Sequence, residues 1–127
     1  MEKNKKTILV VEDEKTLREV LVEKIKNEGF DVLDAKDGEE GLKKAIENQP
    51  DLILLDIIMP KMDGITMFGK LKEDEKGKDI PVIILTNLSP IEGVSQTIDR
   101  DVNNYLVKSD WKLEEVMEQI RNTLNMN

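Results

Sequence analysis

Residues 52–56 read LILLD and are the stretch of this sequence that decides the fold. Four consecutive apolar residues between Pro50 and the Pro- and Gly-containing segment 57–64 are typical of a β-strand that is buried on both faces. The run ends on Asp56, and a carboxylate at the tip of a buried strand needs a metal ion or a cationic partner to stay charged. The sequence therefore predicts a buried strand that carries an acidic functional group at its carboxyl end.

Three other apolar runs also end in polar residues. They are residues 8–11, which stop at Glu12 and Asp13, residues 82–85, which stop at Thr86, and residues 105–107, which stop at Lys108. Helix-like patterns fill the intervals, which suits βα units joined by right-handed crossovers into a parallel sheet. Because the carboxyl ends of parallel strands share one edge, where open α/β sheets usually bind ligands, we expect these polar side chains to converge there.

Amphipathic patterns place a helix after each strand. The first expected helix has its apolar residues within 17–25 and is ended by Gly29. The next three follow the capping-box sequence at 37–40, Asp63 and Ser89-Pro90. The last has its apolar residues within 113–124. A short strand at residues 32–33 lies between the first two helices. The predicted fold class is therefore α/β, a doubly wound (βα)5 domain with a five-stranded parallel sheet. We expect one domain over residues 1–127, with its core at residues 7–125.

Composition fits a globular domain and excludes several kinds of site. The 127 residues are 39% hydrophobic and 36% charged, and a chain of this length can bury about two-thirds of its unfolded surface. It contains neither Cys nor His, which excludes disulfides, thiolate metal sites and His-based acid–base steps. The net charge of -8 argues against direct contact with nucleic acid or an anionic membrane. No apolar stretch is long enough to span a bilayer, and no signal-peptide core precedes the first strand, so we expect a cytoplasmic protein.

The residues expected at the shared edge suit phosphoryl chemistry with Mg²⁺. Asp13 and Asp56, with Glu12 close by, offer hard oxygen ligands, and Mg²⁺ accepts a partial carboxylate shell together with waters and phosphate oxygens. An Asp carboxylate can also attack phosphorus and form an acyl phosphate. Lys108 and the Thr86 hydroxyl can neutralise phosphoryl oxygens during transfer. We therefore predict a site that accepts a phosphoryl group on Asp56.

Each of these residues alone has an ordinary structural explanation. An acidic pair after a strand often stabilises the N-terminus of the following helix. A threonine at a strand end is commonly structural, and a single lysine there is commonly a surface charge. Their joint occurrence, each at the carboxyl end of a strand, is what favours a functional site.

The sequence closely resembles the receiver (CheY-like) domains of bacterial two-component response regulators, over residues 8–124. The resemblance rests on the acidic pair Glu12-Asp13, the phosphoacceptor Asp56 within LDIIMP at residues 55–60, the turn Asp63-Gly64, the hydroxyl residue Thr86, the switch aromatic Tyr105 and Lys108. It implies a flavodoxin-like sheet with the strand order 2-1-3-4-5.

The resemblance also implies a chemical mechanism. A sensor histidine kinase or a histidine phosphotransfer protein would donate the phosphoryl group. The domain would catalyse only its own phosphorylation and dephosphorylation at Asp56, so it is a signalling domain rather than an enzyme acting on other substrates. In this family Mg²⁺ would bind Asp13, Asp56 and the backbone carbonyl of Ile58, with Glu12 acting through water.

A conformational switch follows from the same resemblance. Thr86 would move toward the phosphoryl group and Tyr105 would turn inward behind it. The face formed by the fourth helix, the fifth strand and the fifth helix would then change its partner preference. The output would be a downstream protein target or an output domain, and a phosphorylation-dependent homodimer is compatible with this scheme.

Among the departures from the family pattern, Ser109 and Asn87 keep an alternative open. Ser109 follows Lys108 where the family usually has proline in a cis peptide. A cis bond before a non-proline residue costs about 2.5–4 kcal/mol relative to trans, and we expect the site to hold that strain. Asn87 is larger than the usual small residue after the hydroxyl. These departures leave room for a pseudo-receiver that binds partners without phosphorylation, although such proteins commonly lose the acidic pair, the Asp or the Lys.

A phosphatase of the haloacid-dehalogenase type is a more remote alternative. That family also arranges Asp, Thr or Ser, Lys and an acidic pair around Mg²⁺. It needs an acid–base Asp two residues after the nucleophile, where this chain has Ile58. It also normally carries a cap and a longer chain.

Overall fold

The computed structural model describes residues 5–56, 64–86, 104–107 and 113–124. The elements there are β1 (Thr7–Val11), α1 (Lys15–Asn27), β2 (Asp31–Ala35), α2 (Gly38–Asn48), β3 (Leu52–Asp56), α3 (Gly64–Lys72), β4 (Val82–Thr86), β5 (Asn104–Val107) and α5 (Leu113–Thr123). The strands form one parallel sheet in the order β2-β1-β3-β4-β5. The predicted fold class and strand order are confirmed. The helix predicted after Ser89-Pro90 lies outside the described residues.

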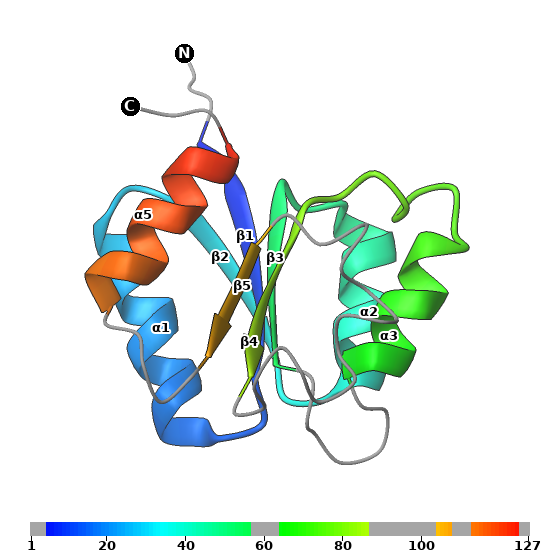
Figure 1. Ribbon diagram of the computed structural model, residues 1–127, viewed down its shortest axis with the longest axis horizontal. Helices are drawn as coiled ribbons and strands as arrows, with labels where there is room; N and C mark the ends of the chain where they lie inside the picture. The colour runs from blue at the N-terminus through cyan, green and yellow to red at the C-terminus, as the bar shows by residue number, and fades with distance from the viewer. Residues whose placement is uncertain (1–4, 57–63, 87–103, 108–112, 125–127) are drawn as a thin grey trace.

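Helices cover both faces of the sheet (Figure 1). α1 and α5 lie on one face, and α2 and α3 lie on the other. Since successive side chains of a strand point to opposite faces, the apolar strand residues divide between two buried clusters. The cluster on the α1–α5 side includes the even-numbered residues Ile8, Val10, Leu52 and Leu54. The cluster on the α2–α3 side includes the odd-numbered residues Leu9, Val11, Ile53 and Leu55.

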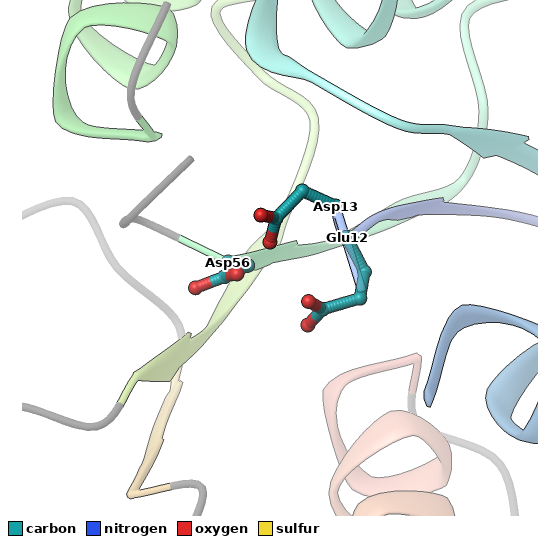
Figure 2. A group of neighbouring side chains, drawn as sticks. All are labelled: Glu12, Asp13 and Asp56. Atoms are coloured by element: carbon teal, nitrogen blue, oxygen red, sulfur yellow. The ribbon is translucent and has the colours of Figure 1, made fainter. Parts of the chain in front are cut away.

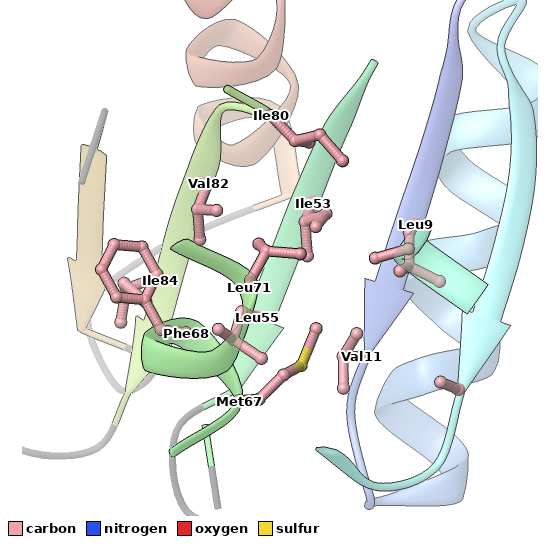
Figure 3. Packing of buried hydrophobic residues seen from close by; sticks show 12 residues of the cluster. Leu9, Val11, Ile53, Leu55, Met67, Phe68, Leu71, Ile80, Val82 and Ile84 are labelled. Carbon is pink, nitrogen blue, oxygen red and sulfur yellow. The ribbon is translucent and has the colours of Figure 1, made fainter. Parts of the chain in front are cut away.

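The burial of β3 on both faces fixes the position of its last residue, Asp56. Figure 3 shows the cluster on the α2–α3 side, where Met67, Phe68 and Leu71 of α3 pack toward the sheet. Full burial of one such side chain contributes about 1.5–3 kcal/mol. A register slip of one residue would turn every side chain of β3 to the wrong face, so this packing specifies the register strongly.

Local signals in the sequence account for two of the helix boundaries. Gly29 follows α1 with a φ of 101°, a left-handed conformation that glycine adopts without a steric penalty. The carboxylate of Asp37 accepts a hydrogen bond from the backbone N–H of Glu40 at 2.8 Å, and Oε1 of Glu40 accepts one from the N–H of Lys36 at 2.8 Å. This reciprocal arrangement matches the predicted capping box in type, and such caps are worth about 1 kcal/mol.

Ion pairs on the surface connect α1 to α5. Nζ of Lys24 lies 2.6 Å from Oε2 of Glu114 and 3.2 Å from Oε2 of Glu28, and Arg121 lies 3.2 Å from Glu28. The hydrogen bond between Lys24 and Glu114 raises the pKa of Lys24 and lowers the pKa of Glu114 from their ordinary values. Exposed pairs of this kind add little stability, so α5 is held chiefly by its buried apolar residues. None of the described helices is long and apolar enough to cross a membrane.

Gly41 allows α2 to pack closely against β1. A Cβ atom at this position would lie 2.9 Å from Cγ2 of Val11 and 3.2 Å from Sδ of Met67, and both side chains are fully buried. Gly69 on α3 offers a matched comparison, because a Cβ there would meet nothing within 4 Å. The two glycines therefore separate the effect of packing from the effect of helix propensity.

Alanine at these two glycines is expected to change stability in opposite directions. Gly69→Ala should raise the free energy of unfolding by about 0.5–1 kcal/mol, the usual gain for replacing glycine inside a helix. Gly41→Ala should lower it by about 1 kcal/mol, because an overpacking cost of about 1–3 kcal/mol exceeds that gain. Urea denaturation of both variants measures the difference. Equal stabilisation by the two substitutions would show that Gly41 is not a close-packing position.

Candidate functional site

Adjacent strands bring three carboxylates to the carboxyl edge of the sheet. β1 and β3 pair in parallel with Val11 opposite Leu55, so the next residue along each strand is Glu12 or Asp56. One carboxylate oxygen each from Glu12, Asp13 and Asp56 lies within 4.8 Å of the other two. Figure 2 shows these side chains gathered at the ends of β1 and β3.

The three side chains differ in their access to solvent. Glu12 is fully buried, Asp56 retains 2% of its accessible surface, and Asp13 is exposed. Asp56 is the last residue of a strand that is paired with β1 on one side and β4 on the other. Asp56 therefore lies at the buried end of the site, on a strand paired on both sides, and Asp13 lies where the site opens to solvent.

Several hydrogen bonds hold the backbone around Glu12. Its N–H donates to the carbonyl of Ala35 on β2 at 3.0 Å. Its own carbonyl accepts a hydrogen bond from Nη1 of Arg18 at 2.9 Å. Its Oε2 accepts one from the N–H of Glu14 at 3.1 Å, across the turn that leads into α1. The acidic pair is thus attached to both α1 and β2.

The chemistry of the donor set fits Mg²⁺. Carboxylates less than 5 Å apart repel one another strongly in a partly buried site unless a cation lies between them. The cluster offers oxygen ligands only, and a hard divalent cation such as Mg²⁺ prefers oxygen ligands and usually keeps several waters. The exposed position of Asp13 leaves room for those waters.

Thr86 and Tyr105, two other predicted site residues, are placed by the pairing of their strands. Thr86 ends β4, one residue beyond Leu85, which lies opposite Asp56 in the sheet. Tyr105 lies in β5 opposite Ile84. The backbone therefore places Thr86 at the same edge of the sheet as Asp56, and its side-chain role stays a prediction. The functional roles of Glu12, Asp13 and Asp56 stay predictions in the same way.

Ile58, Lys108 and the Lys108–Ser109 peptide lie outside the described residues, as does Asn87. The metal-ligand role of the Ile58 carbonyl, the charge-neutralising role of Lys108 and the cis peptide therefore remain expectations from the sequence.

Reasoning from the sequence missed one residue that touches the site. Arg18 is near the start of α1, and its guanidinium reaches back to the backbone of the acidic pair. An arginine near the start of a helix gives no signal of this contact, because its partner is a backbone carbonyl.

The family model for response regulator receiver domains matches residues 8–121 of the chain. Among curated proteins, the DNA-binding dual master transcriptional regulator RpaA of Synechocystis sp. is 37% identical over 114 residues. That match covers 90% of this chain and 47% of RpaA, so the chain spans about half the length of this relative.

Solved structures agree with the family match. The response regulator protein TrrA of Thermotoga maritima, solved in complex with Mg²⁺-BeF, is 36% identical to this chain with a TM-score of 0.79. The match covers 92% of this chain and 97% of the TrrA chain. The receiver domain of the sensor histidine kinase PA1611 of Pseudomonas aeruginosa, solved with a magnesium ion in its active-site cleft, is 26% identical with a TM-score of 0.83. That match covers 94% of this chain and 97% of the other. The chain therefore belongs to the response regulator receiver domains, a family of signalling domains of two-component systems.

Proposed function

We propose that this receiver domain accepts a phosphoryl group on Asp56 in a Mg²⁺-dependent reaction and thereby controls the binding of a partner. The observation that carries the proposal is the cluster of Glu12, Asp13 and Asp56 oxygens within 4.8 Å of one another at the carboxyl edge of the sheet. The magnesium ions in the solved structures of TrrA and of the PA1611 receiver domain support it by analogy.

Asp56 is the best placed of the three carboxylates to act as the nucleophile. Its backbone is fixed between two neighbouring strands and its side chain is almost fully buried, which restricts where the carboxylate can lie while a phosphoryl group approaches. Asp13 is exposed and follows the end of its strand, which suits a metal ligand that must also accommodate waters. Positioning of this kind supplies much of the rate enhancement in phosphoryl transfer.

The transfer step breaks one bond and forms another at phosphorus. An Oδ atom of Asp56 attacks the phosphorus of a phosphohistidine, and the P–N bond breaks. The electron pair of that bond goes to the imidazole nitrogen, and one proton taken up from solvent leaves the histidine as neutral imidazole. The product is an acyl phosphate on Asp56. Attack of water on the same phosphorus later restores the carboxylate and releases inorganic phosphate.

Residues around Asp56 would stabilise the charge that develops in this step. Asp13, Asp56 and the Ile58 carbonyl would hold Mg²⁺, with Glu12 acting through water. When bound, the ion offsets negative charge on the phosphoryl oxygens. Thr86 and Lys108 would contact the remaining phosphoryl oxygens.

The sheet offers a route from the site to a partner-binding face. Thr86 ends β4, which pairs with β5, and Tyr105 lies on β5. We expect Thr86 and Tyr105 to carry the change to the face that includes β5 and α5. The phosphodonor would be a sensor histidine kinase or a histidine phosphotransfer protein in the cytoplasm.

The output would be a separate protein target, an attached output domain or a phosphorylation-dependent homodimer. The net charge of -8 argues against direct contact of this domain with nucleic acid. The match with the DNA-binding regulator RpaA covers 47% of that protein, so more than half of RpaA lies outside it.

Incubation with acetyl phosphate tests the proposal. Intact mass is expected to show one phosphoryl group per chain in the presence of Mg²⁺ and none when the divalent cations are removed with EDTA. Circular dichroism of the same samples checks that the protein is folded in both. The absence of an adduct with any small phosphodonor in the folded protein would contradict the proposal and favour the alternative of a pseudo-receiver that binds partners without phosphorylation.

A further inference from the structure

The side chain of Arg18 connects three elements at the carboxyl edge of the sheet. It belongs to α1, its Nη1 donates to the carbonyl of Glu12 at 2.9 Å, and its Nε lies 3.4 Å from Oδ2 of Asp34 on β2. Only 16% of the Arg18 side chain is exposed, against 49% for Asp34. The guanidinium therefore lies largely covered, in contact with the ends of β1 and β2.

The carbonyl that Arg18 binds belongs to the peptide group that joins Glu12 to Asp13. The preceding peptide group is attached to β2 as well, because the N–H of Glu12 donates to the carbonyl of Ala35. Both peptide groups that flank Glu12 are thus connected to β2, one directly and one through Arg18 and Asp34. The carbonyl of Asp34 also accepts a hydrogen bond from Lys44 of α2, which holds that part of β2.

We propose that Arg18 is a positioning residue for the Mg²⁺ site. It fixes the orientation of the peptide between Glu12 and Asp13, so that both carboxylates face Asp56 despite their mutual repulsion. Without this bond, the turn after β1 would relax toward arrangements that separate the three carboxylates. Mg²⁺ demands a near-ideal octahedral arrangement with short bonds, so such relaxation would weaken its binding. The inference rests on the proposed function, because it takes Mg²⁺ as the ion of this site.

The direction in which Mg²⁺ affinity changes when Arg18 is removed distinguishes a positioning role from a purely electrostatic one. Arg18 is a cation that is hydrogen-bonded to the backbone carbonyl of Glu12, and by Coulomb repulsion alone it would weaken the binding of a second cation at the adjacent site. Removing it would then tighten Mg²⁺ binding. A positioning role predicts the opposite, since the loss of ligand geometry outweighs the loss of repulsion.

Lys15 provides a charge-matched control. It is the first residue of α1, two positions after Asp13, and its side chain is 77% exposed and pairs only loosely with Glu19 at 3.9 Å. Lys15→Met removes the same positive charge from the same turn region without touching the carbonyl of Glu12. Arg18→Met keeps an apolar stem, and Arg18→Lys keeps the charge but loses the forked geometry that reaches two partners at once.

Calorimetric titration with Mg²⁺ tests the proposal on the full chain. Arg18→Met is expected to weaken Mg²⁺ binding about tenfold, the low end of the usual effect of groups that hold metal ligands in place, and Arg18→Lys should weaken it less. Lys15→Met should bind as tightly as the wild type or more tightly. Because Arg18 acts through the metal ligands, saturating Mg²⁺ should largely restore the rate of phosphorylation by acetyl phosphate in Arg18→Met.

The outcomes separate this inference from the proposed function. A wild-type protein that binds no Mg²⁺ would overturn the proposed function itself. A wild type that binds Mg²⁺, with equal or tighter binding by folded Arg18→Met, would overturn only the role of Arg18. If Arg18→Met does not fold, Arg18→Lys decides the question: weaker binding supports the role and unchanged binding overturns it.

Discussion

Asp56→Asn is expected to raise the free energy of unfolding by about 1–3 kcal/mol in the absence of divalent cations. Asp56 is almost fully buried, and its carboxylate lies within 4.8 Å of two others. Two unit charges at that separation repel by roughly 3.5 kcal/mol at an effective dielectric constant of about 20. Asparagine has nearly the same shape and no charge, so it removes the repulsion and the cost of burying a charge. Part of this gain is offset by relaxation of the site and by weaker hydrogen bonds.

Urea denaturation in EDTA measures the effect. Asp79→Asn is a suitable control, because Asp79 is exposed and lies outside the carboxylate cluster, and it should change stability by less than about 0.5 kcal/mol. If Asp56→Asn proved no more stable than the wild type, the three carboxylates would not be under electrostatic strain, and the case for a cation between them would weaken.

Mg²⁺ is expected to stabilise the wild-type protein and to leave Asp13→Asn nearly unchanged. A ligand that binds only the folded state at about 100 times its dissociation constant adds about 2.7 kcal/mol, which corresponds to roughly 10 °C in Tm for a domain of this size. Asp13→Asn removes one of the proposed charged oxygen ligands while leaving the buried core intact. Most of the gain from Mg²⁺ should therefore disappear in this variant.

Two controls assign that stabilisation to the site. Thermal denaturation in NaCl of matched ionic strength removes the contribution of general screening. Asp31→Asn removes an exposed carboxylate at the start of β2, at the opposite end of that strand from Ala35, and it should keep the full gain from Mg²⁺. An equal gain in Asp13→Asn and the wild type would place Mg²⁺ binding elsewhere on the protein.

The strands that are buried on both faces were predictable because their sequences are continuous apolar runs. β2 was harder to predict, and its extent is wrong in the sequence analysis: the prediction covered residues 32–33, whereas the strand is Asp31–Ala35. β2 is the edge strand beside β1, and the exposed side chains of Asp31 and Asp34 interrupt its apolar pattern. Only its pairing with β1, from Thr7 opposite Asp31 to Val11 opposite Ala35, defines its length.

In the candidate site, the clustering of the carboxylates could be predicted from the sequence, whereas the contact of Arg18 with the backbone could not. The proximity of Glu12, Asp13 and Asp56 follows from their places at the ends of parallel strands, a feature that the sequence displays directly. The bond from Arg18 to the carbonyl of Glu12 depends on how α1 leaves the sheet. A backbone carbonyl has no signature in the sequence, so no spacing rule could have identified Arg18.

The central claim is that Asp56, rather than the neighbouring Asp13 or Glu12, receives the phosphoryl group. The most direct measurement is to phosphorylate the protein with acetyl phosphate and Mg²⁺, reduce the acyl phosphate to an alcohol with borohydride and locate the modified residue by peptide mass spectrometry. We expect reduction at Asp56 alone, no adduct in Asp56→Asn and a full adduct in Asp79→Asn. Modification at Asp13 or Glu12, or an undiminished adduct in Asp56→Asn, would contradict this assignment.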